Sequence, residues 1–323
     1  QTHEISQALK EIGVKSKTCI RKSEVYGYSA DINLELDKLR YSFQRNLKIF
    51  SYLISSLPNT DIYHFHGGNF FQQNFLDLKF LKALRRKMVI HFYGSEIRQK
   101  SIAELKNPYV LVKNEDEAQI KYNLSQWSKY IDTAIVYDHE SKQYVENYFK
   151  NIILIKQAVN LKNYNPYYPA KNLDKVRIVH APTSKSFKGT KHVNSVIKKI
   201  SEIHDIDYVE VHGFSHSKAR KIYESADLII DQLIWGVHGV FSVEAMALGK
   251  PVICFIRDDL RKSYPKELPI ISSNPDNLYE VLNQLLDDKN SLNNIGIKGR
   301  EYVEKFHDSR LVAKQLLDIY KKI

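Results

Sequence analysis

The sequence predicts an α/β protein made of two doubly wound halves that face a central cleft. Along all 323 residues, apolar β-branched runs alternate with stretches of helical periodicity. A polar, proline-containing stretch, Asn160–Lys175, interrupts this alternation, and the pattern restarts after it. We therefore expect one parallel sheet on each side of the break, with each sheet covered by helices on both faces.

Residues 1–160 are expected to form the first domain. Thr2–Gly13 predicts a helix because Ile5, Leu9 and Ile12 share one face. An α/β domain normally begins with a strand, so we expect an initial strand and its loop to precede this helix. The expected strands are Thr18–Ile20, Asp61–His66, Met88–Tyr93, Tyr109–Val112, Thr133–Tyr137 and Ile152–Ile155, and the clearest expected helices are Tyr41–Leu57 and Glu140–Tyr148.

Residues 161–307 are expected to form the second domain, with the same alternation of strands and helices. The expected strands are Val176–His180, Tyr208–His212, Asp227–Asp231, Pro251–Ile256 and Pro269–Ser272, and the expected helices are Val193–Ile203, Ser217–Ser225 and Asn277–Leu286. Residues 308–323 contain a last helix, Ser309–Lys322, which we expect to pack back on the first domain. Ligands of doubly wound sheets bind at the carboxyl ends of the strands, so the loops there are the first place to look for a site.

The composition is that of a soluble globular protein. A hydrophobic fraction of 43% can build two cores, and no run of eighteen apolar residues predicts a transmembrane helix. We recognise no signal peptide. Cys19 and Cys254 each lie in an apolar, strand-like run, which favours buried free thiols in a reducing compartment over a disulfide or a metal site.

The net charge of +11 makes nucleic acid, an anionic membrane and phosphorylated small molecules the candidate partners. The many tyrosines do not form the aromatic-plus-basic motifs of RNA-binding modules, so no nucleic acid partner is expected. The densest basic stretch is Lys79–Lys87, with Phe80, Leu81 and Leu84 on its apolar side. A solvated helix face is the preferred interpretation, and contact with an anionic membrane surface is the alternative.

The stretch Trp235–Cys254 combines the features of an anion site. Gly236 and Gly239 allow a tight loop, and Phe241–Leu248 predicts a short helix after it. A glycine-bearing loop that enters a helix presents free backbone N–H groups and the positive end of the dipole to a phosphate. Glu244 lies one turn into this helix, where its carboxylate either accepts hydrogen bonds from sugar hydroxyls or simply favours the dipole.

Residues Glu244–Val252 read Glu-Ala-Met-Ala-Leu-Gly-Lys-Pro-Val. This stretch resembles the donor-site motif of the retaining glycosyltransferases of family GT4, which reads Glu-Ala-Met-Ala and then Gly-x-Pro-Val. The resemblance implies the GT-B fold, in which two Rossmann-like doubly wound domains face a central cleft. It also implies that Glu244 binds the nucleotide ribose and that backbone amides near Val240 and Phe241 hold the diphosphate.

Two further segments are similar to the same family. In Val179–Lys191, Lys188-Gly189 matches a Lys-Gly pair, and Lys185 is the nearest counterpart of the family arginine. In Tyr208–Asp231, a turn at Gly213 and Phe214 is implied to flank the nucleotide base. The donor-binding residues predicted in this way are Thr183, Ser184, Lys185, Lys188, Gly213, Phe214, His238, Gly239, Val240, Phe241 and Glu244.

One position departs from the family motif in the donor site. The family carries a second glutamate eight residues before Glu244, which contacts the donor sugar, and this chain has Gly236 there. Asp231 and His238 are the candidates to replace that glutamate.

In the first domain, His64 and His66 share one face of a strand that ends in Gly67, Gly68 and Asn69. A neighbouring strand ends in His91 and Tyr93. Tyr93 stands where family members carry a histidine that lines the donor sugar. The predicted catalytic residues are His91, Tyr93 and His66, and the predicted acceptor-side residues are His64, Gly67, Gly68 and Asn69. A histidine near the cleft can act as a general base or a hydrogen-bond donor. A metal site on the three histidines is disfavoured because no cysteine or second carboxylate motif accompanies them.

The resemblance implies a metal-independent hexosyltransferase without a cofactor. Its donor would be a UDP- or GDP-linked sugar, and its acceptor a saccharide, a lipid-linked sugar or a glycoprotein, as in polysaccharide biosynthesis. A cytoplasmic location, peripheral at the inner membrane face, fits these partners. The departures at Gly236 and at Tyr93, which stands in place of the family histidine, keep one alternative open: a non-catalytic glycosyltransferase-like subunit that binds a partner glycosyltransferase or a glycan. An epimerase of the same fold is a second alternative, which the Glu-Ala-Met-Ala helix disfavours.

Overall fold

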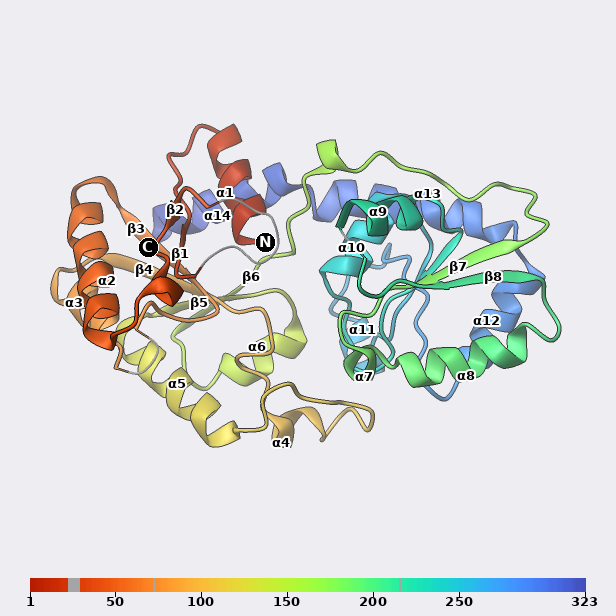
Figure 1. The fold of residues 1–323 in the computed structure, drawn as a ribbon, viewed down its shortest axis with the longest axis horizontal. Helices are drawn as coiled ribbons and strands as arrows, with labels where there is room; N and C mark the ends of the chain where they lie inside the picture. Colours follow the sequence, from red (N-terminus) through yellow and green to blue (C-terminus); the bar gives the residue numbers. More distant parts are fainter. Residues whose placement is uncertain (23–29, 72–73, 215) are drawn as a thin grey trace. The chain divides into compact units, whose positions relative to one another are not determined.

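The computed structural model describes residues 1–22, 30–71, 74–214 and 216–323, and it divides into two compact units (Figure 1). Unit 1 comprises Gln1–Gln99, Asn114–Ala158 and Ser309–Ile323. Unit 2 comprises Lys100–Lys113 and Val159–Asp308. This division differs from the predicted domains 1–160 and 161–307 chiefly in the segment 100–113, which packs with unit 2.

Unit 1 contains a parallel sheet in the order β3-β4-β5-β6 and a separate parallel pair, β1-β2. The strands are β1 (Cys19–Ile20), β2 (Ile32–Asn33), β3 (Ile62–His66), β4 (Lys87–His91), β5 (Thr133–Val136) and β6 (Asn151–Leu154). All four residues of β5 and the last four of β4 are buried. Strands that are buried along their length have both faces covered, as the apolar runs predicted.

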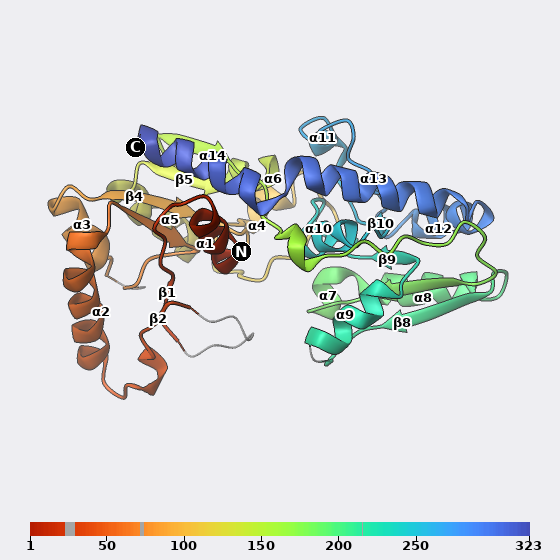
Figure 2. The same ribbon diagram turned by 90° about the horizontal axis from the view of Figure 1, so that it is seen from above.

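The helices of unit 1 lie on both faces of its sheet (Figures 1 and 2). They are α1 (Thr2–Glu11), η1 (Leu36–Lys38), α2 (Ser42–Ser56), η2 (Leu57–Asn59), α3 (Leu76–Ala83), α5 (Glu117–Tyr130), α6 (His139–Val145) and α14 (Ser309–Lys322). Helices α1 and α14 pack on each other and on one face of the sheet, where they cover Ile62 and Val89. The next residue of β3, Tyr63, points to the other face and hydrogen-bonds Ser56 in α2.

Unit 2 has a parallel sheet in the order β10-β9-β7-β8. Its elements are α4 (Lys100–Ala103), η3 (Leu161–Asn163), β7 (Val176–His180), α7 (Lys185–Lys188), α8 (Thr190–Ile200), β8 (Ile206–Glu210), α9 (His216–Glu224), β9 (Leu228–Ile230), α10 (Val240–Ala247), β10 (Val252–Ile253), α11 (Asp258–Arg261), α12 (Leu278–Asp287) and α13 (Ser291–Phe306). Helices α8 and α12 pack on one face of the sheet, where they meet Ile178 and Ile230. Helices α10 and α13 pack on the opposite face, where they meet Val179 and Ile229.

Three predicted elements are wrong. Tyr109–Val112 is irregular, because it does not pair with a strand and the Leu111 carbonyl instead accepts a hydrogen bond from the Trp235 indole. Pro269–Ser272 reduces to one bridge between Ile271 and Ile253. The basic stretch Lys79–Lys87 is not one helix: α3 ends at Ala83, Arg85 takes the left-handed conformation with φ of 54°, and β4 starts at Lys87. Of its expected apolar face, Leu81 is buried, but Leu84 is 45% exposed.

Within the described part of the chain, the helices are too short or too polar to cross a bilayer.

Candidate functional site

The sheet of unit 2 changes winding direction between β7 and β9. From β7 the chain goes to β8 on one side and then returns to β9 on the other side. The three strands end in register, since His180 lies opposite both Glu210 and Ile230. Loops that leave such a point diverge and open a crevice, which is where doubly wound sheets bind ligands. The loops that follow the three strands here are residues 181–184, 211–214 and 231–239, the loops that the motif analysis selected.

A buried ion pair joins two of these loops. The Lys188 ammonium at the end of α7 pairs with the Asp231 carboxylate after β9, and the two side chains are 8% and 0% exposed. Ser242 in the first turn of α10 donates a hydrogen bond to the same carboxylate. The Lys188 ammonium also lies 5.6 Å from the centre of the Trp235 ring. Lys188, predicted to bind diphosphate, and Asp231, a predicted substitute for the missing glutamate, therefore hold each other inside the unit.

Lys185 is the more accessible of the two predicted lysines. Its side chain is 55% exposed, and its ammonium lies 2.6 Å from the Glu210 carboxylate at the end of β8. Hydrogen bonding to this lysine lowers the pKa of Glu210. Thr183 is exposed, and the half-buried Ser184 is the N-cap of α7. These three residues can therefore meet a ligand at the edge of the sheet.

Helix α10 begins where the loop after β9 ends. Its N-cap is Gly239, which has no side chain, and a Cβ at this position would meet nothing within 4 Å. Val240 and Phe241 in the first turn are half-buried. The first N–H groups of a helix have no partner within it and lie at the positive end of the dipole. A phosphate can approach this end closely because the glycine leaves it open.

Glu244 lies one turn further along α10 and is half-buried. Its carboxylate accepts a hydrogen bond of 3.0 Å from the Tyr164 hydroxyl. The Phe241 ring stands 5.0 Å from the Tyr223 ring, and burial followed by the charge of Glu244 raises the pKa of Tyr223 to about 12. Motif reasoning missed Tyr164 because it lies in the polar stretch that we read as a linker, where the run Tyr164-Asn165-Pro166-Tyr167-Tyr168 was the available signal.

The loop after β8 carries the residues predicted to flank a base. Gly213 has φ of +74°, and a Cβ there would meet nothing within 4 Å. The Phe214 ring is 39% exposed, with the Lys218 ammonium 4.5 Å from its centre. An exposed aromatic ring beside an open glycine can stack on a planar base.

His238 and Gly236 lie deeper. His238 is 3% exposed and packs against Tyr264, with 5.2 Å between ring centres, and His307, with 5.8 Å. Gly236 has φ of +79°, and a Cβ there would lie 2.5 Å from Cγ of Arg257. The arginine side chain thus fills the space through which a glutamate at position 236 would have to leave the backbone.

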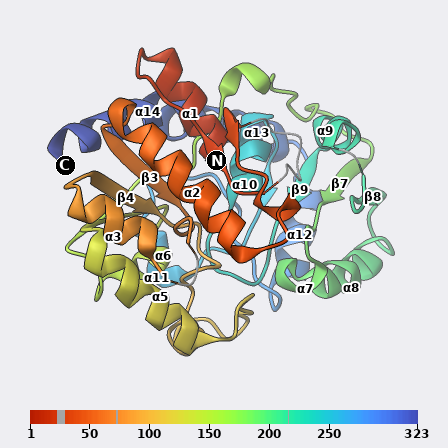
Figure 3. The ribbon, with the colours of Figure 1, turned by 60° about the vertical axis from the view of Figure 1, so that its left-hand side comes forward.

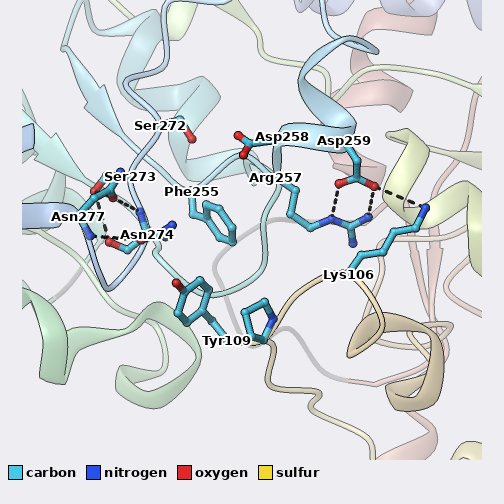
Figure 4. Close-up of a pocket in the computed structure, with 11 residues that line it drawn as sticks. Lys106, Tyr109, Phe255, Arg257, Asp258, Asp259, Ser272, Ser273, Asn274 and Asn277 are labelled. Atoms are coloured by element: carbon cyan, nitrogen blue, oxygen red, sulfur yellow. Dashed lines mark hydrogen bonds and ion pairs between the residues drawn. The ribbon is translucent and has the colours of Figure 1, made fainter.

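Arg257 also lines a cavity of about 660 Å³ in unit 2 (Figure 4). Its guanidinium donates two hydrogen bonds, of 2.9 and 2.7 Å, to the Asp259 carboxylate, and the Lys106 ammonium lies 3.6 Å from the same group. The rings of Tyr109 and Phe255 meet edge to face on the opposite side, 5.8 Å apart. Lys106 and Tyr109 come from the segment 100–113, so the sequence pattern did not reveal this cavity. The available local signal was the charge cluster Arg257-Asp258-Asp259.

In unit 1, imidazole and phenol rings gather where β3, β4 and β5 end. His66 lies opposite His91 in the register of β3 and β4, and His64 lies two residues before His66 on the same face. The ring centres of His64 and His66 are 4.2 Å apart, and those of His66 and His91 are 5.6 Å apart. Tyr93 hydrogen-bonds Nδ1 of His66 and is 38% exposed, while the Tyr137 ring lies 4.7 Å from that of His91.

Burial makes these imidazoles poor bases. His91 is fully buried, and desolvation holds its pKa well below the usual range. The pKa values of His64, at about 3, and of His66 are lowered for the same reason, although part of each ring stays accessible. Neutral imidazoles can share protons through hydrogen bonds, so the cluster suits hydroxyl groups better than anions.

The three histidines also offer one possible metal donor set in unit 1. Their ligand atoms lie within 4.8 Å of one another. The ring planes of His64 and His66 are 20° apart, and those of His64 and His91 are 12° apart. Ligand lone pairs lie in the ring planes, so nearly parallel rings do not converge on one ion. The present ring orientations therefore do not fit a metal.

The residues of the loop after β3 have different structural roles. Gly67 has φ of +69°, and its N–H donates to the His91 carbonyl at 2.8 Å. A Cβ at Gly68 would lie 3.5 Å from the Trp127 ring. Asn69, predicted on the acceptor side, is 5% exposed, donates to Asp77 at 2.9 Å and accepts from the Trp127 indole at 3.0 Å. Its side chain therefore ties the loop to α3 and α5.

Comparison with known proteins identifies the family. Residues 140–302, half of the chain, match the family Glycosyl transferases group 1. The chain belongs to this family. No curated protein sequence matches it. The family implies that this protein is a glycosyltransferase, in agreement with the crevice, the open helix N-terminus and the glutamate of unit 2.

Solved glycosyltransferase structures share the fold. Sucrose-phosphate synthase from Thermosynechococcus elongatus aligns with 99% of this chain and 91% of its own at 16% identity and a TM-score of 0.69. A glycosyltransferase from Rickettsia africae aligns with 99% of this chain and 93% of its own at 15% identity and a TM-score of 0.65. Anabaena HepE in complex with UDP aligns with 86% of this chain and 82% of its own at 10% identity and a TM-score of 0.63. The predicted GT-B fold is confirmed.

Proposed function

We propose that this glycosyltransferase is of the retaining GT4 type. It moves a hexose from a UDP- or GDP-linked sugar to a hydroxyl of a saccharide, a lipid-linked sugar or a glycoprotein. The observation that carries the proposal is that two anion-binding elements follow neighbouring strands of the unit 2 sheet. The exposed Lys185 follows β7, and the open N-terminus of α10, with Glu244 one turn further, follows β9. Anabaena HepE, which has this fold, is described in complexes with UDP and with UDP-glucose, which supports a nucleotide-sugar donor.

The residues of unit 2 are assigned by their charge. The helix dipole of α10 and the Lys185 ammonium offset the charge that develops on the leaving diphosphate, so the transfer needs no metal. Glu244 accepts hydrogen bonds from the ribose hydroxyls, with Tyr164 holding its carboxylate in place. Phe214 stacks on the base. Lys188 acts through Asp231 as a positioning residue, because its ion pair is buried, whereas the Lys185 side chain is 55% exposed.

In unit 1, the neutral imidazole of His66 and the Tyr93 hydroxyl are assigned to the acceptor, where they hold the attacking hydroxyl and share its proton. His91 is 0% exposed and is assigned as a positioning residue that packs against both rings. Gly67 and Gly68 at the end of β3 are assigned to backbone contacts with the saccharide. A peripheral location at the inner membrane face, in the cytoplasm, would give this side access to a lipid-linked acceptor.

The test measures turnover of purified protein. The protein is incubated with UDP- and GDP-hexoses and candidate acceptors, nucleoside diphosphate release is followed, and NMR of the product gives the anomeric configuration. We expect release with one donor class, a retained anomeric configuration and no loss of rate in EDTA. Inversion would overturn the GT4 type, and loss of activity in EDTA that added metal restores would overturn metal independence.

A non-catalytic subunit is the second candidate function, favoured by the arginine that occupies the space of the family glutamate at Gly236. It predicts nucleotide binding without release of diphosphate from any donor, and stable association with a second glycosyltransferase. Isomerisation of the donor sugar without an acceptor would instead indicate an epimerase.

A further inference from the structure

Helix α2 has two apolar faces, and only one of them packs inside unit 1. Ile49 and Leu53 are 3% and 0% exposed and face the core. Phe43, Leu47 and Ile54 are 67%, 63% and 57% exposed. These three positions fall at i, i+4 and i+11, so they line one side of the helix. An ordinary surface helix carries polar residues on that side, so this stripe requires an explanation.

Helix α3 extends the same surface. The Phe50 ring of α2 meets the Phe80 ring of α3 edge to face, with 5.9 Å between centres, and Figure 3 shows the two helices side by side. Leu76 lies one turn before Phe80 and Leu84 one turn after it, and they are 37% and 45% exposed. Residues four apart share a helix face, so both leucines flank the junction. We call the set Tyr41, Phe43, Leu47, Ile54, Leu76 and Leu84 the α2–α3 apolar surface.

Only positive charges surround this surface along its own two helices. Residues 38–60 contain four lysines and arginines and no acidic residue. Two of these four, Arg45 and Lys48, lie within α2. On α3, Lys79 and Lys82 are exposed. The one acidic residue of α3, Asp77, is 0% exposed and is held by Asn69. Two acidic residues from other elements reach this charge: Asp132 lies 3.9 Å from Lys82, and Glu35 forms an ion pair with Lys38.

We propose that the α2–α3 apolar surface docks unit 1 on an anionic lipid bilayer. Exposed aromatic and aliphatic side chains flanked by basic residues are what a helix needs to lie in the headgroup region, with its apolar chains inserted and its cations against lipid phosphates. The inference rests on the proposed function, because this surface would bring the enzyme to a lipid-linked acceptor. The experiment measures binding alone and needs no turnover.

The experiment compares co-sedimentation with vesicles of phosphatidylcholine alone and of phosphatidylcholine with phosphatidylglycerol. We expect binding to the anionic vesicles and little binding to the neutral ones. F43S/L47S should weaken that binding about tenfold or more by removing two inserted side chains. The matched control L105S/I203S removes two exposed apolar side chains from unit 2, which are 80% and 59% exposed, and should bind like the unchanged protein.

A second pair of variants tests the charge. R45E/K48E should abolish the preference for anionic vesicles, whereas K198E/K199E, the same change on α8, should keep most of it. The proposal would be overturned if either test variant and its matched control lost vesicle binding equally. A wild-type dimer in solution that F43S/L47S dissociates would also overturn it, since the stripe would then bind a second copy.

Two readouts separate this proposal from the proposed function. Thermal unfolding of F43S/L47S should match that of the wild type, because both positions are exposed. Loss of vesicle binding with unchanged diphosphate release toward a soluble acceptor would leave the enzyme activity standing. Vesicle binding without any turnover would overturn the proposed activity and leave the proposed docking surface standing.

Discussion

The two units present different chemistry at the carboxyl ends of their strands. In unit 2 these ends carry ion pairs, such as Lys188 with Asp231 and Lys185 with Glu210. In unit 1 they carry a stack of neutral rings, with His64, His66 and His91 deprotonated by desolvation. A diphosphate requires fixed positive charge and open N–H groups, whereas a hydroxyl acceptor requires groups that share a proton. The comparison teaches that two sheets of one architecture can be specialised by the residues that follow their strands.

Strand order adds a second contrast. The unit 2 sheet reverses its winding direction beside β7, and the loops from β7 and β9 open there. The four strands of the main unit 1 sheet follow one another in chain order, β3 to β6. The crevice of unit 2 is therefore a property of topology, while the ring cluster of unit 1 depends on which side chains face α14.

The largest effect is expected from breaking the buried ion pair of unit 2. Lys188→Ala leaves the Asp231 carboxylate buried without its cation, which should cost about 3–5 kcal/mol of unfolding free energy. Urea denaturation measures this. K188M/D231L removes both charges and should recover most of the stability. If the single variant loses under about 1 kcal/mol, the pair does not hold the loops together.

The ring cluster of unit 1 should show itself as a pH dependence of stability. The pKa of His91 is depressed in the folded state, so below the unfolded value of about 6.5 the unfolded chain binds the proton and folding weakens. The loss should reach about 1.4 kcal/mol per pH unit for this one residue. Denaturation at pH 7.5, 6.0 and 5.0 should give a flatter profile for His91→Phe than for the wild type. An unchanged profile would contradict a buried neutral imidazole.

Gly236→Ala tests the packing of Arg257 in unit 2. The positive φ and the 2.5 Å approach to Cγ of Arg257 should together cost about 1–2 kcal/mol. The double variant G236A/R257A should lose less than the sum of the two single variants, because the clash is then gone. Strict additivity in thermal unfolding would show that Arg257 does not exclude a side chain at position 236.

The smallest effect is expected from Glu244→Ala. Loss of the ribose contact should weaken nucleoside diphosphate binding about tenfold, which corresponds to about 1.4 kcal/mol. Isothermal calorimetry measures it, and Tyr164→Phe should reproduce a smaller part of the loss by freeing the carboxylate. Unchanged affinity of E244A for the nucleoside diphosphate would show that this glutamate does not bind the donor.

Local patterns were sufficient for most of the elements and for the position of the helix that carries the donor motif. Periodicity placed Ser309–Lys322 as a helix, and the structure has it with the same bounds. The glycine loop, the helix after it and Glu244 also stand as predicted, because short-range geometry governs glycine conformations and helix starts. The same reasoning was wrong for Tyr109–Val112, where it predicted a strand. A short apolar run carries no information about whether a partner strand is available.

Pairing and exposure were decided by the packing of distant segments. Lys188 looked like a free phosphate ligand until Asp231, 43 residues later, neutralised it inside unit 2. Tyr164 reached Glu244 across 80 residues, and Arg257 filled the space above Gly236. Likewise, the periodicity of α2 showed apolar residues but not which of them would remain outside, since that depends on where the sheet and α3 lie. Sequence spacing constrains neighbours along one element, whereas charge neutralisation and burial depend on contacts between elements that only folding brings together.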